Sequence, residues 1–157
     1  MPLKSKSIHI FLWILLLAFA GCIFSLGLKH TLDARIFYTQ DDALAFLQSL
    51  DSTGLQTYLH VELLDLGFIF TYSMLMYVTL RKMIPNRFYF CFIAFIPGFF
   101  DLVETANIIL FLQNPTYIQS FAWLGTITFL KWTTSAVLLC YISFLRLRLK
   151  QSFGNRS

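Results

Sequence analysis

Residues 88–112 read FYFCFIAFIPGFFDLVETANIILFL, an apolar stretch interrupted by the two acidic residues Asp101 and Glu104. A helix needs about 20 apolar residues to cross roughly 30 Å of hydrocarbon, and this stretch is long enough. Backbone groups inside a bilayer must be hydrogen-bonded within their own segment, which favours a helix. The stretch therefore predicts a transmembrane helix that carries two carboxylates into the membrane.

Three further apolar runs have a similar length: residues 8–28, 59–80 and 118–145. The chain has 157 residues, enough for one domain, and it is 57% hydrophobic and only 13% charged. A typical soluble domain is about 25% charged. The sequence therefore predicts an all-α membrane protein, residues 1–157 forming a single bundle of four transmembrane helices.

The first apolar run has a second interpretation. Two lysines precede it, and Phe19-Ala20-Gly21-Cys22 is similar to the cleavage site of a lipoprotein signal. However, Phe19 is unusual at that position, and the apolar run continues beyond Cys22 to Leu28. We therefore expect a retained helix, on which Ala18, Gly21, Cys22 and Ser25 form a small-residue face suited to close packing.

Basic residues outside the spans are distributed unevenly. Nine lie at the chain ends or in the linker 81–87, whereas only Lys29 and Arg35 lie in the first linker and none in the third. The positive-inside rule then places both termini in the cytoplasm, and we expect the bacterial inner (plasma) membrane. The net charge of +4 arises from these clusters and does not indicate nucleic acid as a partner.

The linker 29–58 is predicted to face outward. Thr39 and Asp42 have the spacing of a capping box, and Ala43, Phe46, Leu47 and Leu50 recur at helical spacing. We expect a short amphipathic helix that lies on the surface or covers the bundle, a solvated loop being the alternative. Residues 51–54 are typical of a turn.

Five charged side chains fall inside predicted spans: Glu62, Asp65, Asp101, Glu104 and Lys131. Such charges cost roughly 2.5–3.5 kcal/mol each at the bilayer centre. At about 1.5 Å per residue, Lys131 lies about 20 Å, Asp101 about 16 Å and Asp65 about 9 Å below the outer ends of their helices. The paired acids are three residues apart, so each pair shares a helix face and can meet Lys131 in one pocket.

Polar neighbours extend these faces. Tyr72 continues the stripe of Glu62 and Asp65, Asn107 follows Glu104, and Thr128 lies one turn before Lys131. Pro97 is expected to kink the third span and free a carbonyl near the acids. The tyrosines near predicted interfaces fit an aromatic belt: Tyr38, Tyr58, Tyr89 and Tyr117.

Three roles for the acidic cluster remain open. Four carboxylates share one lysine, and a buried carboxylate without a cation favours its neutral form, which predicts a proton-sharing site. An ion-pair network with a structural role is the second possibility. A metal site at His60, Glu62 and Asp65 is the third, but HxExxD is not a specific ligand spacing, so we expect neither a metal nor another cofactor.

Several of these residues form a longer pattern over residues 38–145. It comprises Tyr58, Asp65 and Tyr72, then FDLVET at 100–105, then TFLKW at 128–132. In this pattern the chain resembles a family of small bacterial four-helix membrane proteins with FDxxEN and TxLKW motifs, Thr105 replacing the usual Asn. The resemblance adds Trp132 to the candidate residues and implies no particular activity.

A weaker likeness rests on VELL at 61–64 and YVTL at 77–80. This stretch is similar to EXPERA-type proteins, the sterol isomerases and their ligand-binding relatives, which are four-helix bundles with buried acids over a lipid pocket. The first helix here has no acid, unlike that pattern. The likeness implies an isomerase acting on a sterol-like lipid through Glu62, Asp65, Asp101 and Glu104.

The sequence thus supports a membrane protein of unassigned activity that contacts membrane lipid. Its cluster is expected to bind a proton or a small hydrophobic or lipidic ligand through Glu62, Asp65, Tyr72, Asp101, Glu104, Asn107, Thr128, Lys131 and Trp132. An EXPERA-like isomerase and a structural or assembly protein are the alternatives. No protein partner is indicated.

Overall fold

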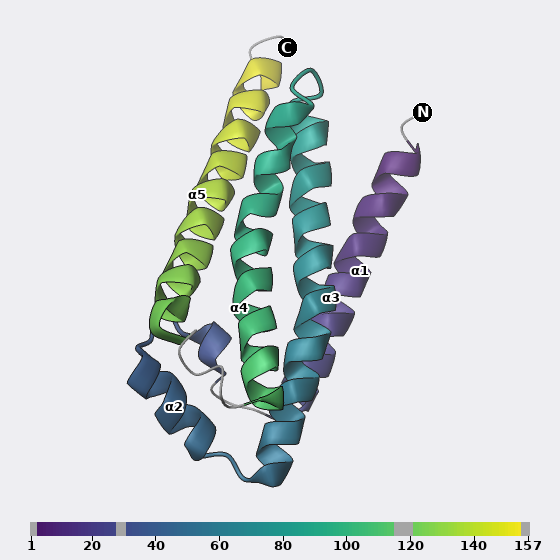
Figure 1. The fold of residues 1–157 in the computed structure, drawn as a ribbon. Helices are drawn as coiled ribbons and strands as arrows, with labels where there is room; N and C mark the ends of the chain where they lie inside the picture. Colours follow the sequence, from purple (N-terminus) through teal and green to yellow (C-terminus); the bar gives the residue numbers. More distant parts are fainter. Residues whose placement is uncertain (1–2, 28–30, 115–120, 155–157) are drawn as a thin grey trace.

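A computed structural model describes residues 3–27, 31–114 and 121–154, and its elements are helices (Figure 1). They are α1 (Leu3–Ser25), η1 (Leu32–Ala34), α2 (Gln40–Gln48), α3 (Ser52–Met83), η2 (Tyr89–Phe95), α4 (Ile96–Gln113) and α5 (Phe121–Gly154). Four described segments are long and apolar enough to cross a membrane: Lys6–Ser25, Ser52–Met83, Tyr89–Gln113 and Trp123–Gln151. The predicted all-α bundle of four membrane helices is confirmed.

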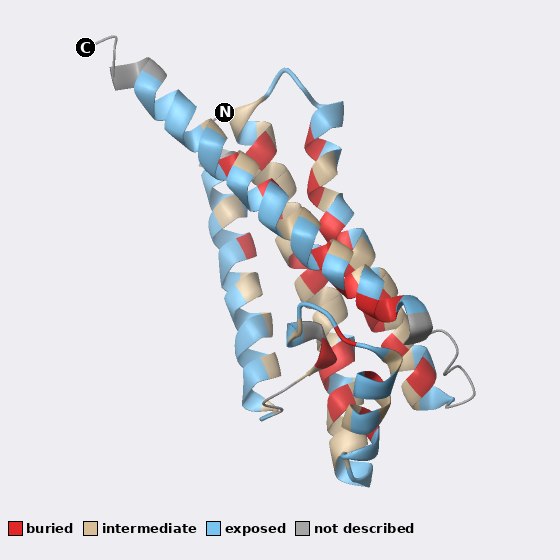
Figure 2. Ribbon diagram, turned by 90° about the vertical axis from the view of Figure 1, so that its left-hand side faces the viewer, coloured by how far each residue is buried: buried red, intermediate tan, exposed pale blue. Residues whose placement is uncertain are grey.

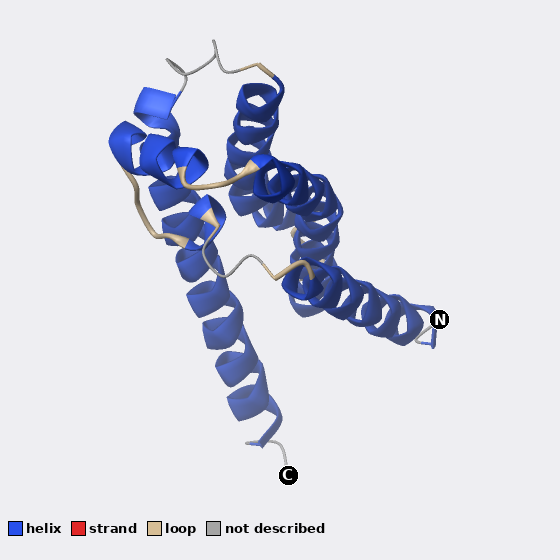
Figure 3. Ribbon diagram, turned by 90° about the horizontal axis from the view of Figure 1, so that it is seen from below, coloured by secondary structure: helices blue, strands red, loops and turns tan. Residues whose placement is uncertain are grey.

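The four long helices pack in the order α1, α3, α4, α5, so that each inner helix contacts a helix on either side. The start of α1, the end of α5 and the α3–η2 turn lie at the same end of the bundle, which we call the terminal end (Figure 1). The short helix α2 lies at the opposite end, the α2 end, and packs on α5. Seen from the α2 end, the axes of α1 and α5 are inclined to one another (Figure 3).

Side-chain caps fix where α2 and α3 begin. Thr39 and Asp42 form a reciprocal capping box at the start of α2, and Ala43 and Leu47 are buried, as the periodicity predicts. Asp51 caps α3 by accepting a hydrogen bond from the Gly54 amide at 2.7 Å. The predicted turn at 51–54 is therefore the first turn of α3, which begins at Ser52 rather than at residue 59.

The third span begins as a 3-10 helix, η2, and continues as α4 from Ile96. Pro97 lies in the first turn of α4, where an α-helix has no partner for the missing proline N–H. Pro97 therefore lies at the change from 3-10 to α geometry and not in the middle of an α-helix, where the kink was expected. Sequence periodicity does not reveal such a change.

The interior has two apolar cores separated by polar side chains. The core at the α2 end contains Leu32, Tyr38, Ala43, Leu47, Tyr58, Val61, Ile108, Phe111 and Leu124. The core at the terminal end contains Leu80, Cys91, Ala94, Leu138 and Ile142. Along α4 and α5, Asp101, Glu104 and Lys131 fall between these two sets. The charged residues therefore lie in a layer that is covered by apolar packing on both sides.

Helix α1 is the most exposed of the long helices (Figure 2). It packs on α3, with Leu12 buried and the Phe19 ring against Gly67, where a larger residue would collide. The predicted small-residue face does not pack in the bundle, because Ala18, Gly21, Cys22 and Ser25 are all exposed. Bulky residues of α1 make the helix contact instead.

Candidate functional site

Lys131 lies at the centre of the polar layer. Its side chain is 7% exposed, and its Nζ contacts Asp101 Oδ1 at 2.9 Å and Glu104 Oε2 at 2.7 Å. Both acids project from the face of α4 that packs against α5, because residues three apart share a helix face. The structure thus brings together the lysine and the two acids that the sequence places at similar depth.

Hydroxyl groups hold the other carboxylate oxygens. Tyr72 of α3 donates a hydrogen bond to Asp101 Oδ2 at 2.9 Å. Tyr38, from the segment before α2, donates to Glu104 Oε1 at 3.0 Å, and Thr128 of α5 donates to the same oxygen. All four oxygens of Asp101 and Glu104 therefore have a partner, and these partners come from three different parts of the chain.

The acids of α3 lie beside this network. Thr105 of α4 donates to Asp65 Oδ2 at 3.1 Å, which joins α3 to α4 one turn from Asp101. Glu62, three residues before Asp65, is fully buried. We call Asp65, Tyr72, Asp101, Glu104, Thr105, Thr128 and Lys131 the polar layer. Tyr38 closes it from the α2 end.

Three other predicted or considered residues lie outside this layer. The Asn107 amide donates to the backbone carbonyl of Val103 in its own helix, at 2.7 Å. The Trp132 indole donates to the Arg35 carbonyl at 2.9 Å, although its ring is half-exposed. His60 is exposed on α3 whereas Glu62 is buried, so the two do not converge. Within residues 3–27, 31–114 and 121–154 there is no group of three His, Cys, Asp or Glu placed to hold a metal.

The sequence does not predict Tyr38 as a member of the site. Tyr38 and Tyr58 were expected in an aromatic belt, but both are buried inside the protein, and Tyr117 lies outside the described residues. Gly125 makes the position of Tyr38 possible, because a Cβ there would overlap the Tyr38 carbonyl. The sequence offers Gly125, in the first turns of the fourth span, as a signal of close packing. A glycine does not show which residue packs against it, so Tyr38 could not be identified.

The layer holds more negative than positive charge. With both acids ionised, Asp101, Glu104 and Lys131 sum to −1, and Asp65 and Glu62 add further carboxyl groups with no second lysine or arginine among the described layer residues. Charges interact more strongly away from water, and an uncompensated buried charge is costly. Uptake of a proton by a carboxylate is the simplest chemistry that corrects this imbalance.

Two cavities of the described structure lie away from these acids. One of about 320 Å³ is at the terminal end, and one of about 380 Å³ lies between η2, α4 and α5, with Ile93, Pro97, Thr134 and Val137 in its wall. None of the nine predicted site residues lines either cavity. A lipidic ligand in these cavities would therefore not contact the carboxylates directly.

Fold and site together define a class: an integral membrane protein of four apolar helices with a buried lysine–carboxylate layer. No family model, no curated protein and no solved structure matches the chain. The two resemblances drawn from sequence motifs therefore remain predictions. What can be proposed about function rests on the side chains of this chain.

Proposed function

We propose that the polar layer is an intramembrane proton-binding site, and that the protein is a proton-responsive membrane protein. The observation that supports this most directly is the pair of carboxylates, Asp101 and Glu104, that share Lys131 at 2.9 and 2.7 Å. One lysine balances one carboxylate, so the second charge is balanced only when a proton is bound. A proton is also the one ligand that needs no cavity.

The hydroxyl groups around the acids supply a means of accommodating that proton. Tyr38, Tyr72 and Thr128 each present an oxygen that can donate or accept, so their hydrogen bonds can reverse when a carboxylate becomes a carboxylic acid. Protonation would then rearrange these hydrogen bonds without moving the four membrane helices. The EXPERA-like alternative requires a substrate in contact with the acids. The acids line neither of the two cavities described above.

Binding of a proton at Glu104 is coupled to the segment before α2. Tyr38 joins this segment to Glu104, and the Arg35 carbonyl joins it to Trp132 beside Lys131. A change in the charge of Glu104 alters the strength of the Tyr38 bond, since hydrogen bonds to ionised groups are stronger than neutral ones. Protonation of Glu104 is therefore expected to change the position of α2.

For the membrane arrangement we propose a bacterial inner membrane with the terminal end in the cytoplasm. The nine basic residues of the chain ends and the linker 81–87 support this orientation. The α2 end would then face outward. The Asp41 and Asp42 side chains are exposed there.

Infrared spectroscopy of the protein in lipid tests the proposal. A protonated carboxyl has a C=O band that a carboxylate lacks, and we expect such a band to vary with pH. Asp101→Asn or Glu104→Gln should remove or shift it, whereas Asp51→Asn, which changes an exposed helix cap, should leave it unchanged. Absence of any protonated carboxyl at every pH would contradict the proposal.

The complete set of partners around Asp101 and Glu104 favours a second candidate, a purely structural ion-pair network. The same experiment separates the two. A structural network predicts that both carboxylates stay ionised over the whole pH range in which the bundle is folded. A band that survives in every layer variant would also remove the layer from consideration as the proton site.

A further inference from the structure

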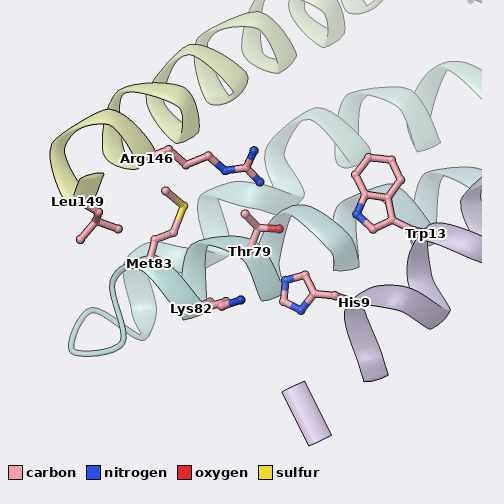
Figure 4. Close-up of a pocket in the computed structure, with 7 residues that line it drawn as sticks. All are labelled: His9, Trp13, Thr79, Lys82, Met83, Arg146 and Leu149. Carbon is pink, nitrogen blue, oxygen red and sulfur yellow. The ribbon is translucent and has the colours of Figure 1, made fainter. Parts of the chain in front are cut away.

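A second feature lies far from the polar layer, in the cavity of about 320 Å³ at the terminal end (Figure 4). It is lined by His9 and Trp13 of α1, by Thr79, Lys82 and Met83 of α3, and by Arg146 and Leu149 of α5. The close-up shows the His9 ring and the charged ends of Lys82 and Arg146 around the same space. Three helices thus contribute one His, Lys or Arg side chain each.

The cavity lies where α1 and α5 flank α3 at the terminal end. Helix α1 packs on α3 and α5 packs mainly on α4, so residues of α3 line the space between α1 and α5. Trp13, Met83 and Leu149 give this space apolar walls. The cavity therefore combines a cationic rim with surfaces that suit hydrocarbon.

No acidic side chain of the chain can neutralise this rim. The sequence has no Asp or Glu before residue 33, none between Asp65 and Asp101, and none after Glu104. All eight acidic residues are thus in the polar layer, beside it on α3, or toward the α2 end. No Asp or Glu side chain is therefore available as a counter-charge for Lys82 and Arg146 at this end.

Two neighbouring arginines, Arg81 and Arg148, do not line the cavity and interact with groups outside it. The Arg81 guanidinium donates to the Pro85 carbonyl at 2.8 Å and lies 4.8 Å from the centroid of the Phe88 ring. Arg148 lies 5.0 Å from the centroid of the Phe144 ring. The positive-inside rule explains why basic residues occur at this end, but it does not explain why two of them and His9 converge on one cavity with a tryptophan.

We propose that this cavity binds the phosphate headgroup of an anionic phospholipid. Lys82 and Arg146 contact the phosphate, and Trp13, Met83 and Leu149 contact the glycerol and the upper acyl chains. Basic pockets between transmembrane helices commonly bind anionic headgroups in this way. Arginine provides two parallel N–H donors to a phosphate, and lysine provides a point charge. The lipid would hold α1 and α5 together across a gap that the protein itself leaves open.

The test compares lipids retained by the full-length protein in native mass spectrometry, after purification from nanodiscs of equal phosphatidylglycerol and phosphatidylcholine. We expect selective retention of phosphatidylglycerol. The double variant Lys82→Gln/Arg146→Gln should bind it about 25-fold more weakly, because each basic residue near a membrane surface contributes about a fivefold factor. The matched control Arg87→Gln/Arg148→Gln removes the same charge outside the cavity and should retain the lipid.

Further outcomes decide between sources of the phosphate group. Inorganic phosphate at millimolar concentration should not displace the lipid, and its binding in place of lipid would overturn the proposal. Equal retention of the two lipids by the unmodified protein, or equal losses in both double variants, would also overturn it. The charge-keeping variant Lys82→Arg/Arg146→Lys should retain phosphatidylglycerol, so that a loss in the glutamine variant is attributed to the missing charges.

Discussion

Lys131 is a single cation placed between two carboxylates, so its removal leaves the buried Asp101 and Glu104 without a neighbouring cation. Losing one member of a buried pair typically costs about 3–5 kcal/mol. Replacing all members by neutral groups of similar volume is much less costly, because no charge is left uncompensated. This difference between single and combined changes is the signature of a shared site.

We therefore expect Lys131→Met to lower the free energy of unfolding by about 3–5 kcal/mol. Adding Asp101→Asn and Glu104→Gln should recover much of that loss. Unfolding of the singles, doubles and the triple in detergent measures both effects. The exposed Lys150→Met serves as the control for charge removal alone, and strictly additive losses at positions 101 and 131 would rule out coupling between them.

Gly125 gives a second test at single-residue scale. A glycine inside a helix is ordinarily less stable than alanine by about 0.5–1 kcal/mol. Gly125→Ala should nevertheless destabilise the protein, because the new Cβ meets the Tyr38 carbonyl. Gly21→Ala on α1 is the matched control, since nothing lies within 4 Å of its Cβ, and it should be neutral or stabilising. Thermal unfolding of both variants decides, and equal effects would contradict the close approach.

At this scale the sequence predicts part of the site. Spacing of three residues and helix depth suffice to bring Asp101, Glu104 and Lys131 together. They do not predict Tyr38, because its approach to Glu104 depends on a tertiary contact with Gly125. They also do not show that Asn107 bonds within its own helix, since an amide can satisfy itself locally as well as across helices.

Among the elements, α2 depends on charge at its first turn. Hydrogen bonds from the backbone amide of Thr39, at 2.9 Å, and from its hydroxyl, at 2.7 Å, hold the pKa of Asp42 below its ordinary range. A carboxyl with a lowered pKa stabilises the folded form above its unfolded pKa. That contribution disappears as the pH falls through the folded pKa.

We expect the first turn of α2 to fray in acid, below the ordinary range of an aspartate. Amide hydrogen exchange at residues 42–44 measures this opening. Asp42→Ala should open the turn already at neutral pH and remove the acid dependence, whereas Asp41→Ala should keep it, because the Asp42 cap remains. An identical acid response in the Asp42 and Asp41 variants would mean that the capping box is not responsible.

Helix α1 gives a further prediction. Its Phe19 ring packs on Gly67 of α3, and its Ile23 packs against the core of the α2 end, so the segment on both sides of Cys22 belongs to the fold. The purified protein should therefore retain the residues before Cys22. Intact mass spectrometry measures this directly, and a product that begins at Cys22 and carries acyl mass would contradict the expectation.

Element types follow well from the sequence, because a run of 20 or more apolar residues has few alternatives to a helix. The ends follow less well. Asp51 extends α3 back to Ser52, and α5 continues to Gly154 beyond the apolar run, because polar residues are as compatible with a helix as apolar ones outside the membrane. The 3-10 geometry of η2 could not be predicted. Its residues are all apolar, so they show no periodicity that would distinguish a 3-10 helix from an α-helix.

For the whole molecule, charge divides along the helix axes. Basic residues gather at the terminal end, and acidic residues lie in the layer, on α3 beside it, and toward the α2 end. The sequence predicts this division and hence the orientation. It does not predict that α1 packs on α3 and α5 packs on α4, because those contacts depend on the tertiary packing.

Labelling with an impermeant thiol reagent tests the orientation in intact cells. In a background with Cys22, Cys91 and Cys140 replaced, Ser52→Cys should react, because it is exposed at the α2 end. Asn86→Cys, exposed in the α3–η2 turn, should react only after the membrane is made permeable. The reverse pattern would invert the proposed orientation.

The ion pairs between α4 and α5 also have a consequence for biogenesis. The ribosome completes Asp101 and Glu104 before Lys131, and the two helices are separated by a short linker. A lone lysine resists partitioning into lipid, whereas one that meets its carboxylates while still leaving the insertion machinery does not carry that cost. We therefore expect α4 and α5 to enter the bilayer together as a helical hairpin, with Asp101 and Glu104 compensating the charge of Lys131.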